Sequence, residues 1–345
     1  MESSGDAHGH GLRDDAIAVW REWLVVVHKP RRLAIVKERD EHRKRISRAN
    51  ANLAAGPDFS LALRKNGSIA CWGSNSNGKA PPDGIQGDFI MVAAGLAHSL
   101  ALQHDGSIAC WGSNEYGEAP PDGIQGDFVA IAAGDFHSLA LQRDGSIACW
   151  GSNEYGRAPP DGIQGDFVAI AAGGAHSLAI RRDGSIACWG YNGWDQAPPD
   201  GIQGDFVAIA AGGDHSLAIR RDGSIACWGY NYDGQAPPDG IQGDFVAVAA
   251  GYYHSLAIRR DGSIACWGDN GDGEAPPDGM QGDFVAIAAG IAHSLALQRD
   301  GSIACWGRND DGQAPTPEHD EEYGEDEYAT LSAKFPFMTD VHILL

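Results

Sequence analysis

The stretch HSLALQRDGSIACWG, residues 137–151, decides the fold. It contains two apolar runs separated by Asp144 and Gly145. A tight turn between two strands needs a residue with positive φ, which glycine adopts at no steric cost. The two runs are therefore predicted to be antiparallel neighbours in a hairpin. Both alternating sets of side chains in SIACW are apolar, so the sheet must be covered on both faces.

The same stretch recurs along the chain at a fixed interval. Each copy contains Cys-Trp-Gly, and successive cysteines are 39 residues apart. The seven positions are Cys71, Cys110, Cys149, Cys188, Cys227, Cys266 and Cys305. A further apolar run precedes each copy, such as FVAIAA at 128–133, and adds a third predicted strand to the repeat. Seven copies without a register slip indicate a repeat architecture.

Sheets that need cover on both faces can stack in a line or close into a ring. An open stack leaves two apolar ends, whereas a ring covers every sheet. The sequence therefore predicts an all-β fold, a seven-bladed β-propeller built from seven 39-residue repeats over residues 49–315. A parallel β-solenoid is the alternative, which the hairpin turns disfavour. Pro-Pro connectors such as Pro120-Pro121 keep the chain from extending the sheet.

Two flanking segments break the repeat. Residues 1–48 are predicted to form an N-terminal arm with a short helix, because apolar residues fall at helical spacing from Ile17 to Val27. The arm is basic over 28–48, and this stretch either contacts the acidic ring or binds lipid or nucleic acid. Residues 316–345 are predicted to form an acidic tail.

The first repeat departs from the others at the point where the ring must close. The first repeat has Asn50 and Asn52 in its first strand, where the other repeats carry Phe and an apolar or small residue. We therefore expect a further edge strand at the first or last blade, from residues 335–345 or from residues 24–27, with a preference for 335–345.

Composition limits the classes of function. The net charge of -22 argues against a nucleic-acid-binding face on the propeller, because phosphate binding needs clustered Lys and Arg. No stretch reaches 18 consecutive apolar residues, so no transmembrane segment is expected. The absence of a signal-like N-terminus predicts an intracellular protein, cytoplasmic or nuclear. No cofactor, metal or small-molecule substrate is predicted.

Comparison of the seven copies shows where this protein tolerates variation. Two stretches vary, namely the residue pair before the His-Ser-Leu-Ala motif and the loop after Trp-Gly. The expected strand directions bring both stretches to one face of the ring, where loops can make contacts without disturbing the scaffold. Aromatic residues gather in these stretches and form the predicted partner-binding site. They are Tyr116, Phe136, Tyr155, Tyr191, Trp194, Tyr230, Tyr232, Tyr252 and Tyr253.

Acidic residues share the predicted face and favour a basic or mixed-charge protein partner. They are Glu115, Glu118, Asp135, Glu154, Asp195, Asp214, Asp233, Asp269 and Asp272. Neutral drift after repeat duplication is the alternative explanation for variation at these positions. Drift alone should favour small polar residues, and the aromatic enrichment therefore favours binding.

The repeated His, Cys and Trp positions are expected to be structural. Six histidines recur at one position, and Phe59 replaces the histidine in the first copy. One histidine per blade spaces them too widely for one metal ion, so each is predicted to hydrogen-bond a neighbouring loop. The cysteines are predicted to pack as small core residues and the tryptophans to lie between blades.

The motifs HSLA and DGSIACWG, with Asn114 and Gly117 in the following loop, resemble regulator-of-chromosome-condensation repeats. The compact unit is most similar to that of the type II β-lactamase inhibitor protein. The resemblance implies a seven-bladed propeller, and family members act in nucleotide exchange on a small GTPase, light sensing, ubiquitin ligases and enzyme inhibition. The Gly-Trp-Arg-His-Thr motif of the light sensor has no match here.

Strict repetition does not supply the asymmetric cluster of groups that catalysis requires, so no enzyme activity is expected. The predicted function is a non-catalytic protein-protein interaction module. Regulation of a small GTPase by nucleotide exchange and inhibition of an enzyme are the alternatives that the resemblance implies.

Overall fold

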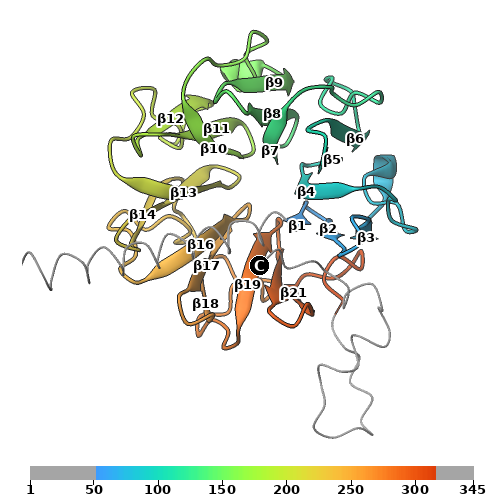
Figure 1. Cartoon of the computed structure of the whole chain (residues 1–345). Coiled ribbons are helices and arrows are strands. Elements are labelled where there is room, and N and C mark those ends of the chain that lie inside the picture. Colours follow the sequence, from blue (N-terminus) through green and yellow to red (C-terminus); the bar gives the residue numbers. More distant parts are fainter. Residues whose placement is uncertain (1–51, 316–345) are drawn as a thin grey trace, which may run out of the picture. The chain divides into compact units, whose positions relative to one another are not determined.

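A computed structural model describes residues 52–315 and shows an all-β ring (Figure 1). Seven sheets of three antiparallel strands follow one another around a central axis, as the blades of a propeller do. The all-β prediction with one three-stranded sheet per repeat is therefore confirmed. The predicted arm at 1–48, the acidic tail at 316–345 and both candidate closing strands lie outside the described residues.

Each repeat contributes its strands in order from the axis outwards (Figure 1). The inner strands are β1 (Leu53–Ala55), β4 (Phe89–Ala94), β7 (Phe128–Ala133), β10 (Phe167–Ala172), β13 (Phe206–Ala211), β16 (Phe245–Ala250) and β19 (Phe284–Ala289). The middle strands are β2 (Phe59–Leu63), β5 (His98–Gln103), β8 (His137–Gln142), β11 (His176–Arg181), β14 (His215–Arg220), β17 (His254–Arg259) and β20 (His293–Gln298). The outer strands are β3 (Ile69–Gly73), β6 (Ile108–Gly112), β9 (Ile147–Gly151), β12 (Ile186–Gly190), β15 (Ile225–Gly229), β18 (Ile264–Gly268) and β21 (Ile303–Gly307). Two 3-10 helices, η2 (Ser76–Gly78) and η3 (Glu154–Gly156), follow β3 and β9.

The Asp-Gly turns join the middle and outer strands as predicted. In the third repeat Gly145 has φ +90°, and β8 pairs with β9 in antiparallel register. The Asp144 carboxylate accepts hydrogen bonds from the Ser146 amide, at 2.9 Å, and from the Ser146 hydroxyl, at 2.6 Å. The turn is therefore fixed by the side chain of Asp144, three residues before β9 begins at Ile147, which explains why Asp-Gly-Ser recurs.

The core lies between neighbouring sheets. In the middle strand β8, Leu139 and Ala140 are fully buried on opposite faces of the sheet. Phe167 and Ala179 of the next repeat join Leu139 in one apolar cluster. Adjacent sheets therefore cover each other, as the double-sided apolar pattern of the strands required.

The ring closes between the seventh and first repeats without a gap in the contacts. Strand β1 pairs with β2 from Leu53 to Ala55 and also lies against β19 and β20. The first sheet is complete from its own repeat, although Asn52 lies buried at its start.

Candidate functional site

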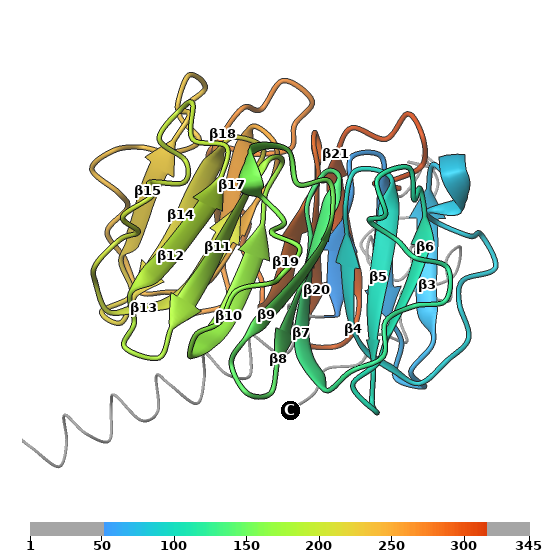
Figure 2. The ribbon, with the colours of Figure 1, turned by 90° about the horizontal axis from the view of Figure 1, so that it is seen from above.

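The two variable stretches of each repeat meet at one end of the ring, which we call the variable face. In the third repeat, the amide of Ser152 at the start of the loop donates a 2.8 Å hydrogen bond to the carbonyl oxygen of Phe136 in the residue pair. The amide of Tyr230 bonds the carbonyl oxygen of Asp214 in the same way, also at 2.8 Å. The outer strands end at this face and begin at the Asp-Gly turns on the opposite face (Figure 2).

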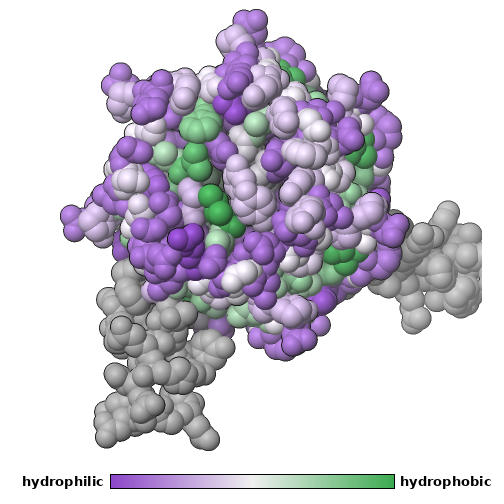
Figure 3. Space-filling view, turned by 180° about the vertical axis from the view of Figure 1, so that it is seen from behind, coloured by the Kyte–Doolittle hydropathy of each residue, from purple (hydrophilic) through white to green (hydrophobic). Residues whose placement is uncertain are grey.

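All nine aromatic residues of the predicted binding site lie in these stretches, and five of them are exposed. The exposed fractions are 55% for Tyr116, 57% for Tyr155, 51% for Trp194, 85% for Tyr232 and 40% for Tyr253. The other four are half-buried, namely Phe136, Tyr191, Tyr230 and Tyr252. The variable face is otherwise mainly hydrophilic, with separate hydrophobic patches (Figure 3).

The aromatic rings contact one another in five pairs, three of which join neighbouring repeats and two of which lie within one repeat. Tyr155 of the third repeat lies 5.0 Å from Tyr191 of the fourth, measured between ring centroids. The remaining pairs are Tyr116 with Phe136 at 5.3 Å, Trp194 with Tyr230 at 5.1 Å, Tyr230 with Tyr232 at 6.4 Å, and Tyr252 with Tyr253 at 4.9 Å. These contacts hold the half-buried rings beneath or beside the exposed ones, so the exposed rings are partly preorganised.

The variable face is hollowed at the axis by a small cavity of about 90 Å³, whose lining is mostly Gly and Ala. Asp135 and Tyr252 contribute the polar side chains of this lining. Burial raises the pKa of Asp135 to about 6, although the nearby Arg157 guanidinium lowers it. Burial raises the pKa of Tyr252 to about 12, and the Asp135 and Asp214 carboxylates add to the rise. The axis therefore presents a desolvated acid beside a neutral phenol.

A repeated hydrogen-bond network joins each blade to the next. Between the third and fourth repeats, His137 Nε2 lies 2.8 Å from the hydroxyl oxygen of Ser177. The same hydroxyl donates to the carbonyl oxygen of Arg157, at 3.1 Å, and the indole N–H of Trp189 donates to that carbonyl at 2.9 Å. The histidines were predicted to bond a neighbouring loop, but their direct partner is a serine on the middle strand of the next blade. The tryptophans were predicted to lie between blades, and the indole of Trp189 does bond across this junction.

The network fixes the tautomer of the histidines. A serine hydroxyl carries one hydrogen, and in Ser177 that hydrogen goes to the Arg157 carbonyl. His137 must therefore donate from Nε2, which leaves Nδ1 as an unprotonated nitrogen, and this atom is buried without a partner. A second proton on His137 would be a buried donor without an acceptor, and burial lowers the pKa of His137 to about 3.

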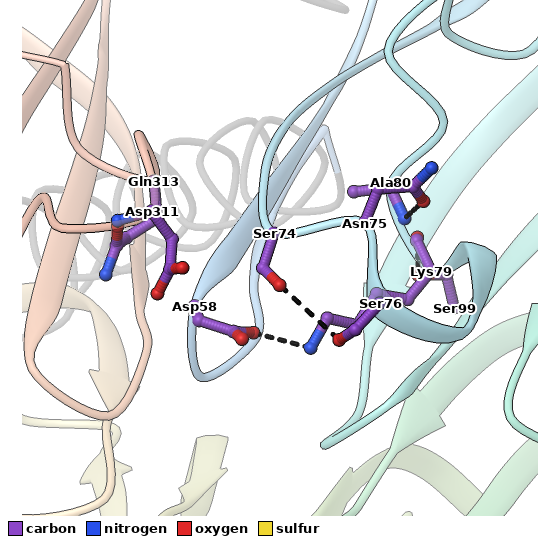
Figure 4. A network of polar contacts seen from close by, with 9 residues as sticks. All are labelled: Asp58, Ser74, Asn75, Ser76, Lys79, Ala80, Ser99, Asp311 and Gln313. Carbon is purple, nitrogen blue, oxygen red and sulfur yellow. Dashed lines mark hydrogen bonds and ion pairs between the residues drawn. The ribbon is translucent and has the colours of Figure 1, made fainter.

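The junction between the first and second repeats differs because Phe59 replaces the histidine. Ser99 still donates to the carbonyl oxygen of Lys79, at 2.9 Å. The Lys79 ammonium forms a 2.7 Å ion pair with Asp58 (Figure 4). It also lies 5.3 Å from the centroid of the Phe59 ring. A cation above the aromatic ring and a partly buried ion pair thus occupy this junction.

The seven cysteines are free, and burial raises the pKa of each thiol to about 12. Cys149 pairs with Leu139 across the sheet and belongs to an apolar cluster, in agreement with the predicted packing role. A protonated, buried thiol is a poor nucleophile. Within residues 52–315, no group of three or more His, Cys, Asp or Glu side chains could hold a metal ion.

Sequence analysis missed one set of residues that supports the variable loops. One buried polar side chain stands at the end of each loop, directly before Ala-Pro-Pro in six of the repeats and before Ala-Pro-Thr in the last. We call these the loop-base residues: Lys79, Glu118, Arg157, Gln196, Gln235, Glu274 and Gln313. None is more than 5% exposed. Their identity changes between acid, amide and base, which in a sequence is typical of solvated positions.

Glu118 is the site residue for which the expectation was wrong. It was expected to be one of the acids that face a partner, but only 1% of its surface is exposed. Its carboxylate accepts hydrogen bonds from the Ser113 hydroxyl, at 2.9 Å, and from the Tyr116 amide, at 2.8 Å. The other eight acids of that set are exposed or half-buried on the variable face.

The repeat model described as "Regulator of chromosome condensation (RCC1) repeat" matches seven segments that together span more than half of the chain. The segments are 51–79, 90–118, 128–157, 167–193, 206–235, 245–274 and 284–313. No curated protein matches the chain at a significant level. In residues 52–315 no helix has the length and hydropathy to cross a membrane.

Several solved structures share the fold. The ectodomain of the Physcomitrella patens receptor kinase CR4 is 25% identical, with 74% of this chain and 73% of that chain covered and a TM-score of 0.61. The CRINKLY WD40 ectodomain of the Arabidopsis thaliana receptor kinase ACR4 is 24% identical, with coverages of 77% and 98% and a TM-score of 0.62. Prp20p from Saccharomyces cerevisiae, a structure reported with its binding to Gsp1p and histones, is 21% identical, with coverages of 77% and 84% and a TM-score of 0.59.

Proposed function

The chain belongs to the regulator of chromosome condensation (RCC1) repeat family, and from this premise we propose that it is a non-catalytic module that binds a protein partner through the variable face. One observation carries the proposal. Five large aromatic side chains stand exposed on loops of neighbouring blades, and they are braced by half-buried rings. Rigid, exposed aromatic residues are the residues that dominate binding energy in protein interfaces.

The charge of the variable face supports a basic or mixed-charge partner. Glu115, Glu154, Asp195, Asp233 and Asp272 are exposed beside the aromatic residues. Such a face attracts a positively charged surface at long range, and screening by salt weakens that attraction. We therefore expect the association rate constant of the complex to fall as the salt concentration rises.

The test compares two variants of the full chain with the unchanged protein. The first variant replaces the five exposed aromatic residues of the variable face by serine: Tyr116, Tyr155, Trp194, Tyr232 and Tyr253. The control variant replaces five exposed aspartates of the connectors by serine: Asp122, Asp161, Asp200, Asp239 and Asp278. A partner is isolated with the unchanged protein from a lysate of the source cells, identified, purified and titrated against all three proteins by calorimetry.

We expect the aromatic variant to lose at least about 100-fold in affinity and the control variant to retain it, because five anchors are each worth roughly 1 kcal/mol or more. Equal affinities of both variants would show that the aromatic residues do not contribute to binding and arose by neutral drift after repeat duplication. A small GTPase loaded with a fluorescent nucleotide provides a separate arm. If the unchanged chain accelerates nucleotide release from this GTPase, its function is nucleotide exchange and not binding alone.

A further inference from the structure

The second and third repeats contain a natural comparison, because their variable loops share the sequence Ser-Asn-Glu-Tyr-Gly and differ at the loop-base residue. The loop of the second repeat, 113–117, ends at Glu118, and the loop of the third, 152–156, ends at Arg157. Any difference in conformation between the two loops therefore has to come from the loop-base residue or from the neighbouring blades.

The two loops do differ in conformation. Tyr155 has φ +62° and lies in the 3-10 helix η3, whereas Tyr116 is not among the residues with positive φ and its loop is a plain turn. The amide of Tyr116 donates to the Glu118 carboxylate at 2.8 Å. Arg157 has only donors, and it instead donates to the carbonyl and hydroxyl oxygens of Ser152, at 3.1 and 2.6 Å.

The other five repeats follow the same division. Where the loop-base residue is Glu or Gln, its side-chain oxygen accepts a hydrogen bond from the amide two residues earlier. The bonds are Trp194 to Gln196 at 2.9 Å, Asp233 to Gln235 at 3.0 Å, Asp272 to Glu274 at 2.8 Å and Asp311 to Gln313 at 2.9 Å. The first repeat has Lys79, and there Asn77 has φ +63° within the 3-10 helix η2.

The physical cause is the lack of an acceptor on a basic side chain. A Glu or Gln at the loop base has a side-chain oxygen that accepts a hydrogen bond from the amide two residues earlier, and this bond holds that residue at negative φ. Lys and Arg cannot accept that bond. The peptide bond before the residue two positions ahead of the loop base therefore turns over, and that residue moves to positive φ. Tyrosine at positive φ is strained, and the bonds from Arg157 to Ser152 hold the loop in that state.

We propose that the loop-base residues are specificity-determining positions beneath the variable face: an acceptor or a base at the loop base selects one of two loop conformations and so sets how the loop aromatic is presented. The two presentations differ in their contacts. The Tyr116 ring packs on Phe136 in the residue pair of the next blade, whereas the Tyr155 ring packs on Tyr191 at the start of the next loop. The functional consequence rests on the proposed binding role of these rings, whereas the conformational switch does not.

Reciprocal substitutions in the full chain test the switch. We expect a crystal structure of Glu118→Arg to show Tyr116 at positive φ, and one of Arg157→Glu to show Tyr155 at negative φ with its amide bonded to the new carboxylate. Glu118→Gln and Arg157→Lys are the matched controls, because Gln and Lys occur at loop bases of this chain, and both should leave the loops unchanged. Glu118→Arg with Tyr116 still at negative φ, or a control that switches its loop, would overturn the proposal.

A measurement on the unchanged protein keeps the proposal testable if a charge-reversed variant does not fold. The Tyr116 amide should exchange with solvent deuterium at least 10-fold more slowly than the Tyr155 amide, because only the former is bonded to its loop-base side chain. Equal exchange rates would contradict the inference. Affinity for the isolated partner is measured separately: a loop that switches without any change in affinity counts against the binding role of that tyrosine and leaves the switch in place.

Discussion

Acidification should unfold the ring through its buried histidines as the pH falls from 6.5 towards 5. Burial lowers the pKa of all six junction histidines, to about 4 for His98 and His254 and to about 3 for the other four. The unfolded chain binds a proton on each histidine near pH 6.5, and the folded ring does not. The stability that depends on neutral histidines is therefore complete above pH 6.5 and is lost as the pH falls towards the folded values.

The magnitude follows from the number of protons. Each proton taken up on unfolding lowers the free energy of unfolding by about 1.4 kcal/mol per pH unit, so six lower it by up to about 8 kcal/mol per pH unit. Asp135 opposes this, because its raised pKa lets the folded state bind a proton near pH 6 and offsets about one of the six. Domains are typically stable by about 5–15 kcal/mol, so the loss should be complete within roughly two pH units below 6.5.

Urea denaturation followed by tryptophan fluorescence at pH 7.5, 6.5, 6.0, 5.5 and 5.0 measures this slope. His137→Phe is the matched variant, because Phe59 fills the equivalent position of the first repeat against Gly56 as His137 does against Gly134. It should reduce the slope by about 1.4 kcal/mol per pH unit. A slope below about 1.4 kcal/mol per pH unit between pH 6 and 5 in the unchanged protein would refute the reasoning.

Two further predictions concern the same scaffold. Ser138→Ala removes the hydroxyl bonded to His98 Nε2 and should lower the free energy of unfolding by about 1–3 kcal/mol. Ser99→Ala, at the junction where Phe59 replaces the histidine, should lower it by about 1 kcal/mol. Urea denaturation measures both, and equal losses would show that the bond between His98 and Ser138 contributes nothing to stability. Because burial raises the pKa of the cysteine thiols to about 12, Cys149 and its equivalents should react with a disulfide reagent at pH 8 at least about 100-fold more slowly in the native than in the unfolded protein. Rapid native labelling of any of them would show that the strand opens.

The fold could be predicted from the sequence because the residues that determine it are local and repeated. Asp144 and Gly145 specify a turn within four residues. The same hairpin recurs every 39 residues, so the sequence predicts seven of them. The double-sided apolar pattern of the strands then requires neighbouring sheets. The position of the variable face follows from counting strand directions, which needs no side-chain geometry.

The buried residues beneath the candidate site could not be predicted from the sequence in the same way. Glu118 and Arg157 stand at equivalent positions, and a change from acid to base normally indicates a solvated residue. Their burial depends on the next blade, which lies 39 residues further along the chain. The serine partner of each histidine also comes from the next blade, 40 residues away in His137 and Ser177. Sequence patterns describe single repeats, and these interactions exist only between repeats.

The chemistry of the junctions explains how one ring tolerates loops of different sequence. Ser177 and Trp189 both donate to the loop-base residue Arg157, but they bond its backbone carbonyl and not its side chain. Every residue type offers that carbonyl, so the bonds between blades are the same whether the loop base is acid, amide or base. The side chain is left to organise the loop above it. Variation at the loop base can therefore change the variable face without weakening the scaffold, which is the separation of roles that the proposed binding surface requires.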